Sequence, residues 1–174
     1  MDPGNVFDLD WLMKHLNNRT LDEMKMEIAS TPVVVKDLRL GPMLQTPLFF
    51  IVLWEEDYFD FLRYFVEDLL VSVDAEDTMK QTALYYASRE GRNRFVRYML
   101  DHSKIQDKDQ ITDMLGQTPL FYAISTNKFE TVEILFNYGF KINVWDNANE
   151  TPLYYAMKKA DLQLIEFLLK NGAS

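Results

Sequence analysis

The 174-residue chain contains no cysteine and only two histidines. The absence of cysteine excludes disulfides, thiolate catalysis and cysteine-ligated metal sites, and it fits a reducing compartment. His15 and His102 lie far apart in the sequence, and neither has a second metal ligand at helical spacing, so no zinc site is predicted. The six glycines are scattered and form no phosphate-binding loop. We therefore expect no metal and no cofactor.

Positive charge is also scarce, because 27 acidic residues outnumber 18 basic residues and give a net charge of -9. Such a surface repels phosphate backbones and anionic lipid heads, so we expect neither nucleic acid nor a membrane as partner. The longest charge-free run, residues 40–54, is shorter than the roughly 20 apolar residues that span a bilayer. The N-terminus begins with acidic residues and lacks an apolar signal core. A cytoplasmic or nuclear location is the natural prediction.

Few residue groups suggest catalysis. Asp101, His102 and Ser103 place three catalytic residue types side by side, but adjacent residues cannot face one another as orienting group, base and nucleophile. We interpret them as a polar helix end. Carboxylate pairs such as Glu55 and Glu56 are numerous in an acidic chain, and none is distinguished as an acid–base couple. The chain is therefore predicted not to be an enzyme.

A repeated segment is the main feature that the sequence does contain. Thr-Pro-Leu begins at residues 46, 118 and 151, and a Thr-Ala-Leu version begins at residue 82, which gives intervals of 36, 36 and 33 residues. Each interval is the length of one helix–turn–helix unit with its connecting turn. Hydrophobic residues make up 48% of the chain, enough for a folded domain with a substantial core.

Each signature predicts the start of a helix. The threonine offers a side-chain oxygen to the free N–H groups of the first turn, and the proline has no N–H to leave unpaired there. Apolar residues follow at helical spacing, as in Leu153 and Met157, and two overlapping i, i+4 pairs in residues 164–169 predict a second helix. Gly139 and Gly172 stand where a left-handed residue would end two of these second helices.

Three segments carry a resemblance to the ankyrin repeat family: "DTMKQTALYYA" from Asp77, "DMLGQTPLFYA" from Asp113 and "DNANETPLYYA" from Asp146. The resemblance covers residues 41–174 and implies an all-α solenoid of stacked helix–turn–helix units with short β-turn fingers. The units lie near residues 41–76, 77–112, 113–145 and 146–174. We interpret residues 1–40 as a degenerate helix pair that caps the N-terminal end, because terminal repeats must present a polar outer face.

Two departures from the family pattern lead to further expectations. Aromatic residues replace the histidine of the motif, at Phe49, Tyr85, Phe121 and Tyr154, so we expect aromatic core packing in place of an inter-repeat hydrogen-bond network. The last unit is followed by no polar capping segment, which fits a fragment of a longer protein.

The resemblance implies a binding surface formed by the turns and by the exposed ends of the first helices. Met43, Met79 and Met114 fall at or next to the same turn position, where the family usually has polar residues. Exposed apolar residues commonly mark interaction sites, so we predict a strip that binds a peptide or protein. Alternatively, these residues fold back against neighbouring turns. The candidate partner-binding residues are Met43, Leu53, Trp54, Met79, Arg89, Met114, Leu115, Trp145, Lys158 and Lys159.

Trp54 precedes Glu55 and Glu56, which suggests a narrower hypothesis. The indole could hold a cation over its face, as some ankyrin arrays hold methylated lysine. The alternative is that Trp54 covers the two extra residues that lengthen the bend around residues 55–58.

The leading functional prediction is a non-enzymatic protein-interaction module, a docking or scaffold array that is monomeric alone. One alternative is a targeting or regulatory domain of a larger enzyme or channel, which the length of the native open reading frame would reveal. Another is a short ankyrin-type inhibitor of a kinase or transcription factor, which would abolish its partner's activity on mixing.

Overall fold

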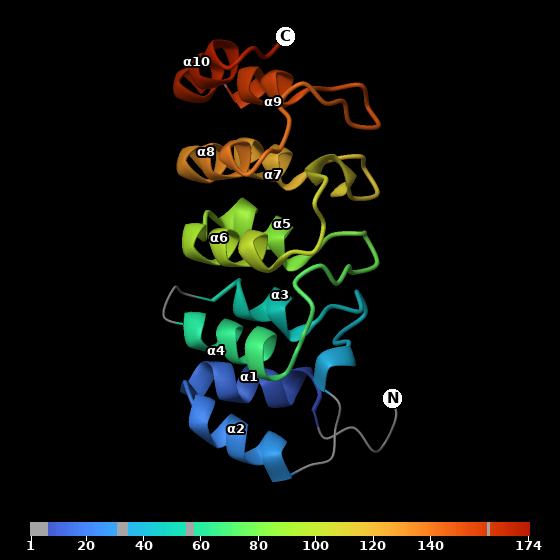
Figure 1. The fold of residues 1–174 in the computed structure, drawn as a ribbon, viewed down its shortest axis with the longest axis vertical. Coiled ribbons are helices and arrows are strands. Elements are labelled where there is room, and N and C mark those ends of the chain that lie inside the picture. Colours follow the sequence, from blue (N-terminus) through green and yellow to red (C-terminus); the bar gives the residue numbers. More distant parts are fainter. Residues whose placement is uncertain (1–6, 31–34, 55–57, 160) are drawn as a thin grey trace.

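The computed structural model describes residues 7–30, 35–54, 58–159 and 161–174, which form an elongated stack of helix pairs with loops projecting to one side (Figure 1). Apart from one isolated β-bridge between Leu40 and Gln45, the described residues contain helices, turns and loops, which confirms the predicted all-α class. The pairs are α1 (Leu9–Asn18) with α2 (Leu21–Ser30), α3 (Pro47–Ile51) with α4 (Phe59–Arg63), α5 (Ala83–Glu90) with α6 (Asn93–His102), α7 (Pro119–Ser125) with α8 (Phe129–Asn137), and α9 (Pro152–Lys159) with α10 (Leu162–Lys170).

Short helical segments complete the stack. The second helix of the α3 pair continues as a π-helix, η3 (Tyr64–Asp68), and the 3-10 helices η1 (Val35–Asp37) and η4 (Lys108–Gln110) lie in connections. Gly139 and Gly172 follow α8 and α10 with φ values of 97° and 91°. Because glycine adopts this left-handed conformation without strain, both residues end their helices as predicted.

The threonines begin the first helices as predicted, but the expected side-chain caps are wrong in three units. Thr46, Thr82 and Thr118 have extended backbones, and their side chains accept no capping hydrogen bond. Their backbone carbonyls instead accept the N–H three residues later, at 3.1 Å in each unit, so that N–H no longer needs a side-chain acceptor. In the last unit, Thr151 Oγ1 does accept from the N–H of Tyr154, at 3.3 Å.

The aromatic residues of the repeat form a chain of ring contacts along the core. Phe49, Tyr85 and Phe121 are buried, and each lies edge-on to a tyrosine of the next pair, with ring centroids 5.2–5.5 Å apart. The expected core packing is therefore confirmed for these three rings. It is wrong for Tyr154, whose side chain is 45% exposed because α9 belongs to the last pair that the structure describes.

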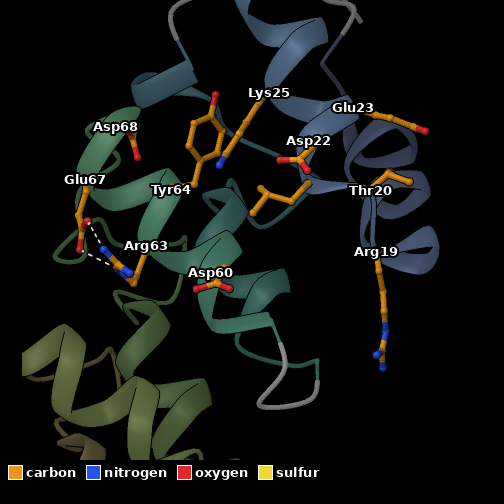
Figure 2. A pocket seen from close by; sticks show the side chains of 11 residues that line it. Arg19, Thr20, Asp22, Glu23, Lys25, Asp60, Arg63, Tyr64, Glu67 and Asp68 are labelled. Atoms are coloured by element: carbon orange, nitrogen blue, oxygen red, sulfur yellow. Dashed lines mark hydrogen bonds and ion pairs between the residues drawn. The ribbon is translucent and has the colours of Figure 1, made fainter.

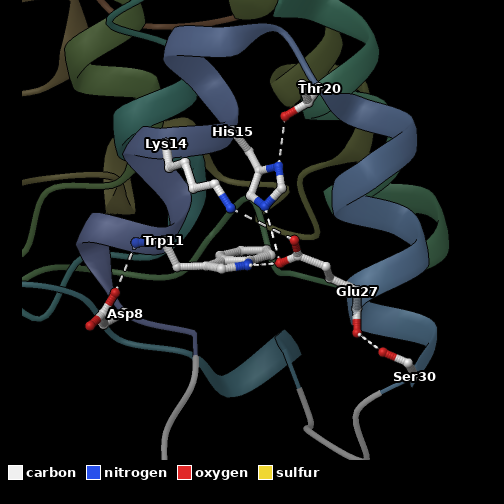
Figure 3. A network of polar contacts seen from close by, with 7 residues as sticks. All are labelled: Asp8, Trp11, Lys14, His15, Thr20, Glu27 and Ser30. Atoms are coloured by element: carbon white, nitrogen blue, oxygen red, sulfur yellow. Dashed lines mark hydrogen bonds and ion pairs between the residues drawn. The ribbon is translucent and has the colours of Figure 1, made fainter.

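A polar network joins the first two helices (Figure 3). The Trp11 indole N–H donates to Glu27 Oε2 at 2.7 Å, and His15 Nε2 lies 3.2 Å from the same oxygen. His15 is fully buried, and its Nδ1 lies 2.7 Å from Thr20 Oγ1. Since Trp11 and His15 are on α1 and Glu27 is on α2, this network fixes the relative position of the pair.

Candidate functional site

Three similar loops precede α5, α7 and α9 and form the projections visible in Figure 1. We call residues 77–81, 113–117 and 146–150 the fingers. Each finger begins with a buried aspartate, and one carboxylate oxygen of this residue accepts the N–H groups two and four residues later, at 2.8–3.0 Å. The aspartate N–H donates to the carbonyl four residues later, also at 2.8–3.0 Å. The three aspartates, Asp77, Asp113 and Asp146, therefore close their loops.

Backbone hydrogen bonds connect one finger to the next. The N–H of Thr78 donates to the carbonyl of Met43 at 3.0 Å, and the N–H of Met114 donates to the carbonyl of Met79 at 3.1 Å. The N–H of Asn147 continues the series to the carbonyl of Leu115 at 2.9 Å. These bonds hold the turn before α3 and the three fingers in a fixed register.

This register gathers four of the sequence-predicted residues into one row, which we call the fingertip strip: Met43, Met79, Met114 and Leu115. Met79, Met114 and Leu115 are 36%, 55% and 49% exposed, so their side chains face solvent. Met43 is half-buried, and its sulfur accepts from Thr78 Oγ1 at 3.4 Å, so the fold-back alternative describes this one residue. The strip is thus apolar and held by a hydrogen-bonded backbone.

Glutamine side chains form bridges between successive units, which corrects the expectation that ring packing replaces an inter-repeat hydrogen-bond network. Gln81 Nε2 donates to Asp113 Oδ2 at 2.8 Å and to the Tyr122 hydroxyl at 2.7 Å. The Tyr122 hydroxyl donates to the same Asp113 oxygen at 2.7 Å. Two further bridges have the same form, Gln45 with Asp77 and Tyr86, and Gln117 with Asp146 and Tyr155.

Burial and the neighbouring carboxylate act together on the tyrosines of these bridges. Burial raises the pKa of Tyr122 above its ordinary value, and its hydrogen bond to Asp113 raises that pKa further. The hydroxyl therefore stays protonated and donates throughout the physiological range. A signal for the bridges was present in the sequence. Asp77 and Asp113 are each followed by a glutamine after four residues and by a tyrosine after nine residues.

Two cationic candidates lie over aromatic rings near the C-terminal ends of the first helices. The Arg89 guanidinium is 5.0 Å from the Tyr86 ring centroid, and Lys158 Nζ is 5.9 Å from that of Tyr154. Lys159 lines a shallow hollow with residues 125–127, 161 and 162. These contacts place Arg89 and Lys158 against their own first helices.

Leu53, Trp54 and Trp145 are not part of the fingertip strip. Leu53 and Trp54 follow the end of α3 that lies away from the fingers (Figure 1), and they line a cavity of about 490 Å³ with Asn17, Arg19 and Tyr58. The Trp54 and Tyr58 rings meet edge-on, with centroids 6.3 Å apart. Glu55 and Glu56, which the cation hypothesis invoked, lie outside the described residues. Trp145 is 66% exposed and precedes the last finger.

A charged groove between α2 and the α4–η3 helix was missed from the sequence (Figure 2). It has a volume of about 600 Å³ and is lined by residues 19–23 and by Lys25, Asp60, Arg63, Tyr64, Glu67 and Asp68. Arg63 donates two hydrogen bonds to the Glu67 carboxylate, at 3.2 and 3.1 Å, and these bonds are the largest cause of the lowered pKa of Glu67. A carboxylate held ionised in this way is a poor general acid, so Glu67 serves as a hydrogen-bond acceptor in the groove.

The described part of the chain supports the interpretation of residues 101–103 as a helix end. α6 ends at His102, whose Nδ1 lies 2.8 Å from the carbonyl of Tyr98. Asp101 accepts from the Tyr138 hydroxyl, and the Ser103 hydroxyl donates to Asp74, so the three side chains have separate partners. Within the described ranges, no group of three or more His, Asp or Glu could hold a metal ion, and no helix is both long and apolar enough to cross a bilayer.

In a comparison with known protein families, residues 103–174 match the family described as ankyrin repeats (3 copies). No curated protein sequence matches the chain significantly. Ankyrin repeats are generally protein–protein interaction modules. This match shows ankyrin repeats in residues 103–174, and the stacked helix pairs with their hydrogen-bonded fingers are those of an all-α ankyrin solenoid.

Proposed function

We propose that the chain is a non-enzymatic docking module that binds a peptide or protein segment on its fingers and on the concave face beside them. In this proposal, residues 41–174 act as four binding units and residues 1–40 cap the N-terminal end. The lack of cysteine supports a cytoplasmic or nuclear setting, and the net charge of -9 argues against nucleic acid and anionic membranes as partners.

The observation that carries the proposal is the exposure of the fingertip strip on a fixed backbone. Apolar side chains in an exposed row favour association, because a partner that covers them removes apolar surface from water. The finger-to-finger hydrogen bonds already hold the backbone in register, so binding orders little additional chain. Methionine side chains adapt to the shape of a partner, which suits the capture of a peptide or helix.

The bridges indicate which polar groups the partner should bring. Each bridge uses both hydrogens of its glutamine Nε2, whereas no hydrogen bond within the described structure uses Oε1 of Gln45, Gln81 or Gln117. One such acceptor oxygen therefore recurs in each of the three bridges. A partner segment with N–H donors and positive charge complements these oxygens and the acidic chain.

Affinity capture from source-cell lysate tests the proposal. The parent chain is compared with a Met79→Glu, Met114→Glu double variant and with Met26→Glu, a control that adds charge at a 74% exposed methionine on α2. Circular dichroism must show equal folding of all three chains. We expect a partner that the parent and the control retain and the double variant loses. Equal capture by all three chains would contradict binding by the strip.

A further inference from the structure

The last helix pair exposes positions that the preceding pairs bury against their neighbours. Tyr154 is 45% exposed, whereas Tyr85 and Phe121, at the same position of the repeat, are each 1% exposed. Met157 is 61% exposed, whereas Ile124 at the equivalent position is fully buried. These side chains on α9 therefore point where a further layer of protein would pack.

The second helix of the pair continues this surface. Leu162 and Leu169 on α10 are 74% and 53% exposed. Their counterparts on α8, Phe129 and Phe136, both contact the ring of Phe167 in the next pair, with centroids 5.6 Å apart. Leu162 and Leu169 thus occupy positions that join one pair to the next. We call the four exposed residues the end face: Tyr154, Met157, Leu162 and Leu169.

A glutamate at the margin of the end face favours a basic partner group. Glu150 occupies the position at which Gln45, Gln81 and Gln117 donate to the aspartate of the following finger. The Glu150 carboxylate cannot donate a hydrogen bond as the glutamine amides do. A second carboxylate placed against it would bring two negative charges into contact. A partner that brings a cation to Glu150 is favoured instead.

Charges of opposite sign flank the apolar centre of this surface. Glu150 precedes Tyr154 by four residues, and Lys158 follows it by four residues, with its Nζ 5.9 Å from the Tyr154 ring centroid. Two α9 helices packed antiparallel across a two-fold axis would bring Lys158 of each chain toward Glu150 of the other. An isologous interface requires this kind of self-complementarity.

The opposite end of the stack lacks this arrangement. On α2, Asp22, Glu23 and Ser30 are exposed, and the exposed apolar side chains described on that helix are Met26 and the small Ala29. A head-to-tail contact would therefore cover the end face with a mainly polar surface, whereas a tail-to-tail contact buries two apolar faces against each other.

We propose that two copies of the chain associate tail to tail through the end face, with Glu150 of each copy paired with Lys158 of the other. This inference is independent of the fingertip strip and replaces the monomer that the sequence led us to expect. The contact uses Glu150, the last residue of the third finger, but none of the residues of the fingertip strip, so the dimer would present two fingertip strips to partners.

Sedimentation equilibrium over concentrations on the order of 1 to 100 μM tests the proposal. We expect the parent to approach twice the 20.5 kDa mass of one chain. Met157→Glu should raise the dissociation constant about tenfold or more by placing a charge in the apolar contact, whereas Met26→Glu should leave it unchanged. A mass of one chain at every concentration would overturn the proposal, as would a dimer that Met157→Glu does not weaken.

Charge exchange tests the pairing itself. Glu150→Lys and Lys158→Glu should each weaken the dimer, because each variant places like charges opposite each other. The double variant should recover most of the parent affinity, since opposite charges face each other again. A double variant as weak as the two changes added together would exclude the antiparallel arrangement. The Met79→Glu, Met114→Glu variant should still dimerise, so loss of partner capture and loss of self-association are separable.

Discussion

The threonine at the start of a first helix does not always cap that helix through its side chain. Thr46 and Thr118 start their helices, yet their hydroxyl oxygens are buried without a hydrogen-bond partner. Asp161, by contrast, accepts the N–H of Leu164 at 3.0 Å and caps α10 through its side chain. The sequence predicts where these helices begin, but the choice between carbonyl and hydroxyl as acceptor depends on local backbone geometry.

Replacement of Thr118 by valine tests the role of its hydroxyl. The two side chains have similar shape, and the change removes a buried oxygen that has no partner, so we expect the free energy of unfolding to change by less than about 0.5 kcal/mol or to rise slightly. Asp161→Ala should cost about 1 kcal/mol, because it removes a true cap. Urea unfolding of both variants measures these values, and a cost at Thr118 as large as that at Asp161 would show that the hydroxyl has a hidden partner.

Glu27 should give the protein a component of acid sensitivity. The hydrogen bond from Trp11 is the largest cause that lowers the pKa of Glu27, and His15 lowers it further. A carboxyl whose pKa is lower in the folded chain contributes stability above its unfolded pKa and loses it as the pH falls through the folded value. Below about pH 4.3, the parent should therefore lose stability more steeply than Glu27→Gln. Urea midpoints across this range test the difference, and parallel curves would contradict it.

At the scale of secondary-structure elements, the units are joined by both rings and polar bridges. Gln117 Nε2 donates to Asp146 at 2.7 Å and to the Tyr155 hydroxyl at 2.8 Å, so one side chain connects the finger of one unit to the finger and first helix of the next. The carboxylate of Asp146 also closes its own finger. The same aspartate therefore shapes the finger and holds it to the preceding unit.

Exchange of glutamine and glutamate at matched positions tests the bridges. Gln117→Glu removes the donor and places a carboxylate against Asp146, so we expect a loss of about 1–3 kcal/mol in the free energy of unfolding. Glu150→Gln makes the reverse change where no following unit is described, and it should alter the unfolding energy by less than about 0.5 kcal/mol. Urea unfolding measures the free energies of unfolding of the two variants, at a protein concentration low enough to keep the chains monomeric. Equal effects would mean that the bridges contribute little to stability.

Sequence and structure agree best where a feature depends on residues close together in the chain. The repeat register, the starts of the first helices and the left-handed Gly139 and Gly172 follow from local pattern and backbone preference. The bridge from Gln81 to Asp113 spans 32 residues and required the stacking geometry. The exposure of Tyr154 depends on its place in the last described pair rather than on its sequence motif.

At the scale of the whole molecule, the stack presents several surfaces with different chemistry. The fingertip strip is apolar and carries acceptor groups beside it, the groove near α2 and α4 carries paired charges, and the end face is apolar with a charge at each margin. Stacked units contact only their neighbours, so each surface can act without rearranging the others. In our proposal, the partner binds the strip and a second copy of the chain binds the end face.

The nine methionines of the chain can serve as probes of binding at the fingertip strip and at the end face. A photoreactive methionine analogue is incorporated throughout, the chain is irradiated in source-cell lysate, and cross-linked positions are mapped by mass spectrometry. We predict cross-links to partner protein from Met79 and Met114, and cross-links from Met157 to a second copy of the chain. Cross-links to partner protein from Met26 or Met157, with none from Met79 and Met114, would contradict the proposal that the fingertip strip is the docking surface.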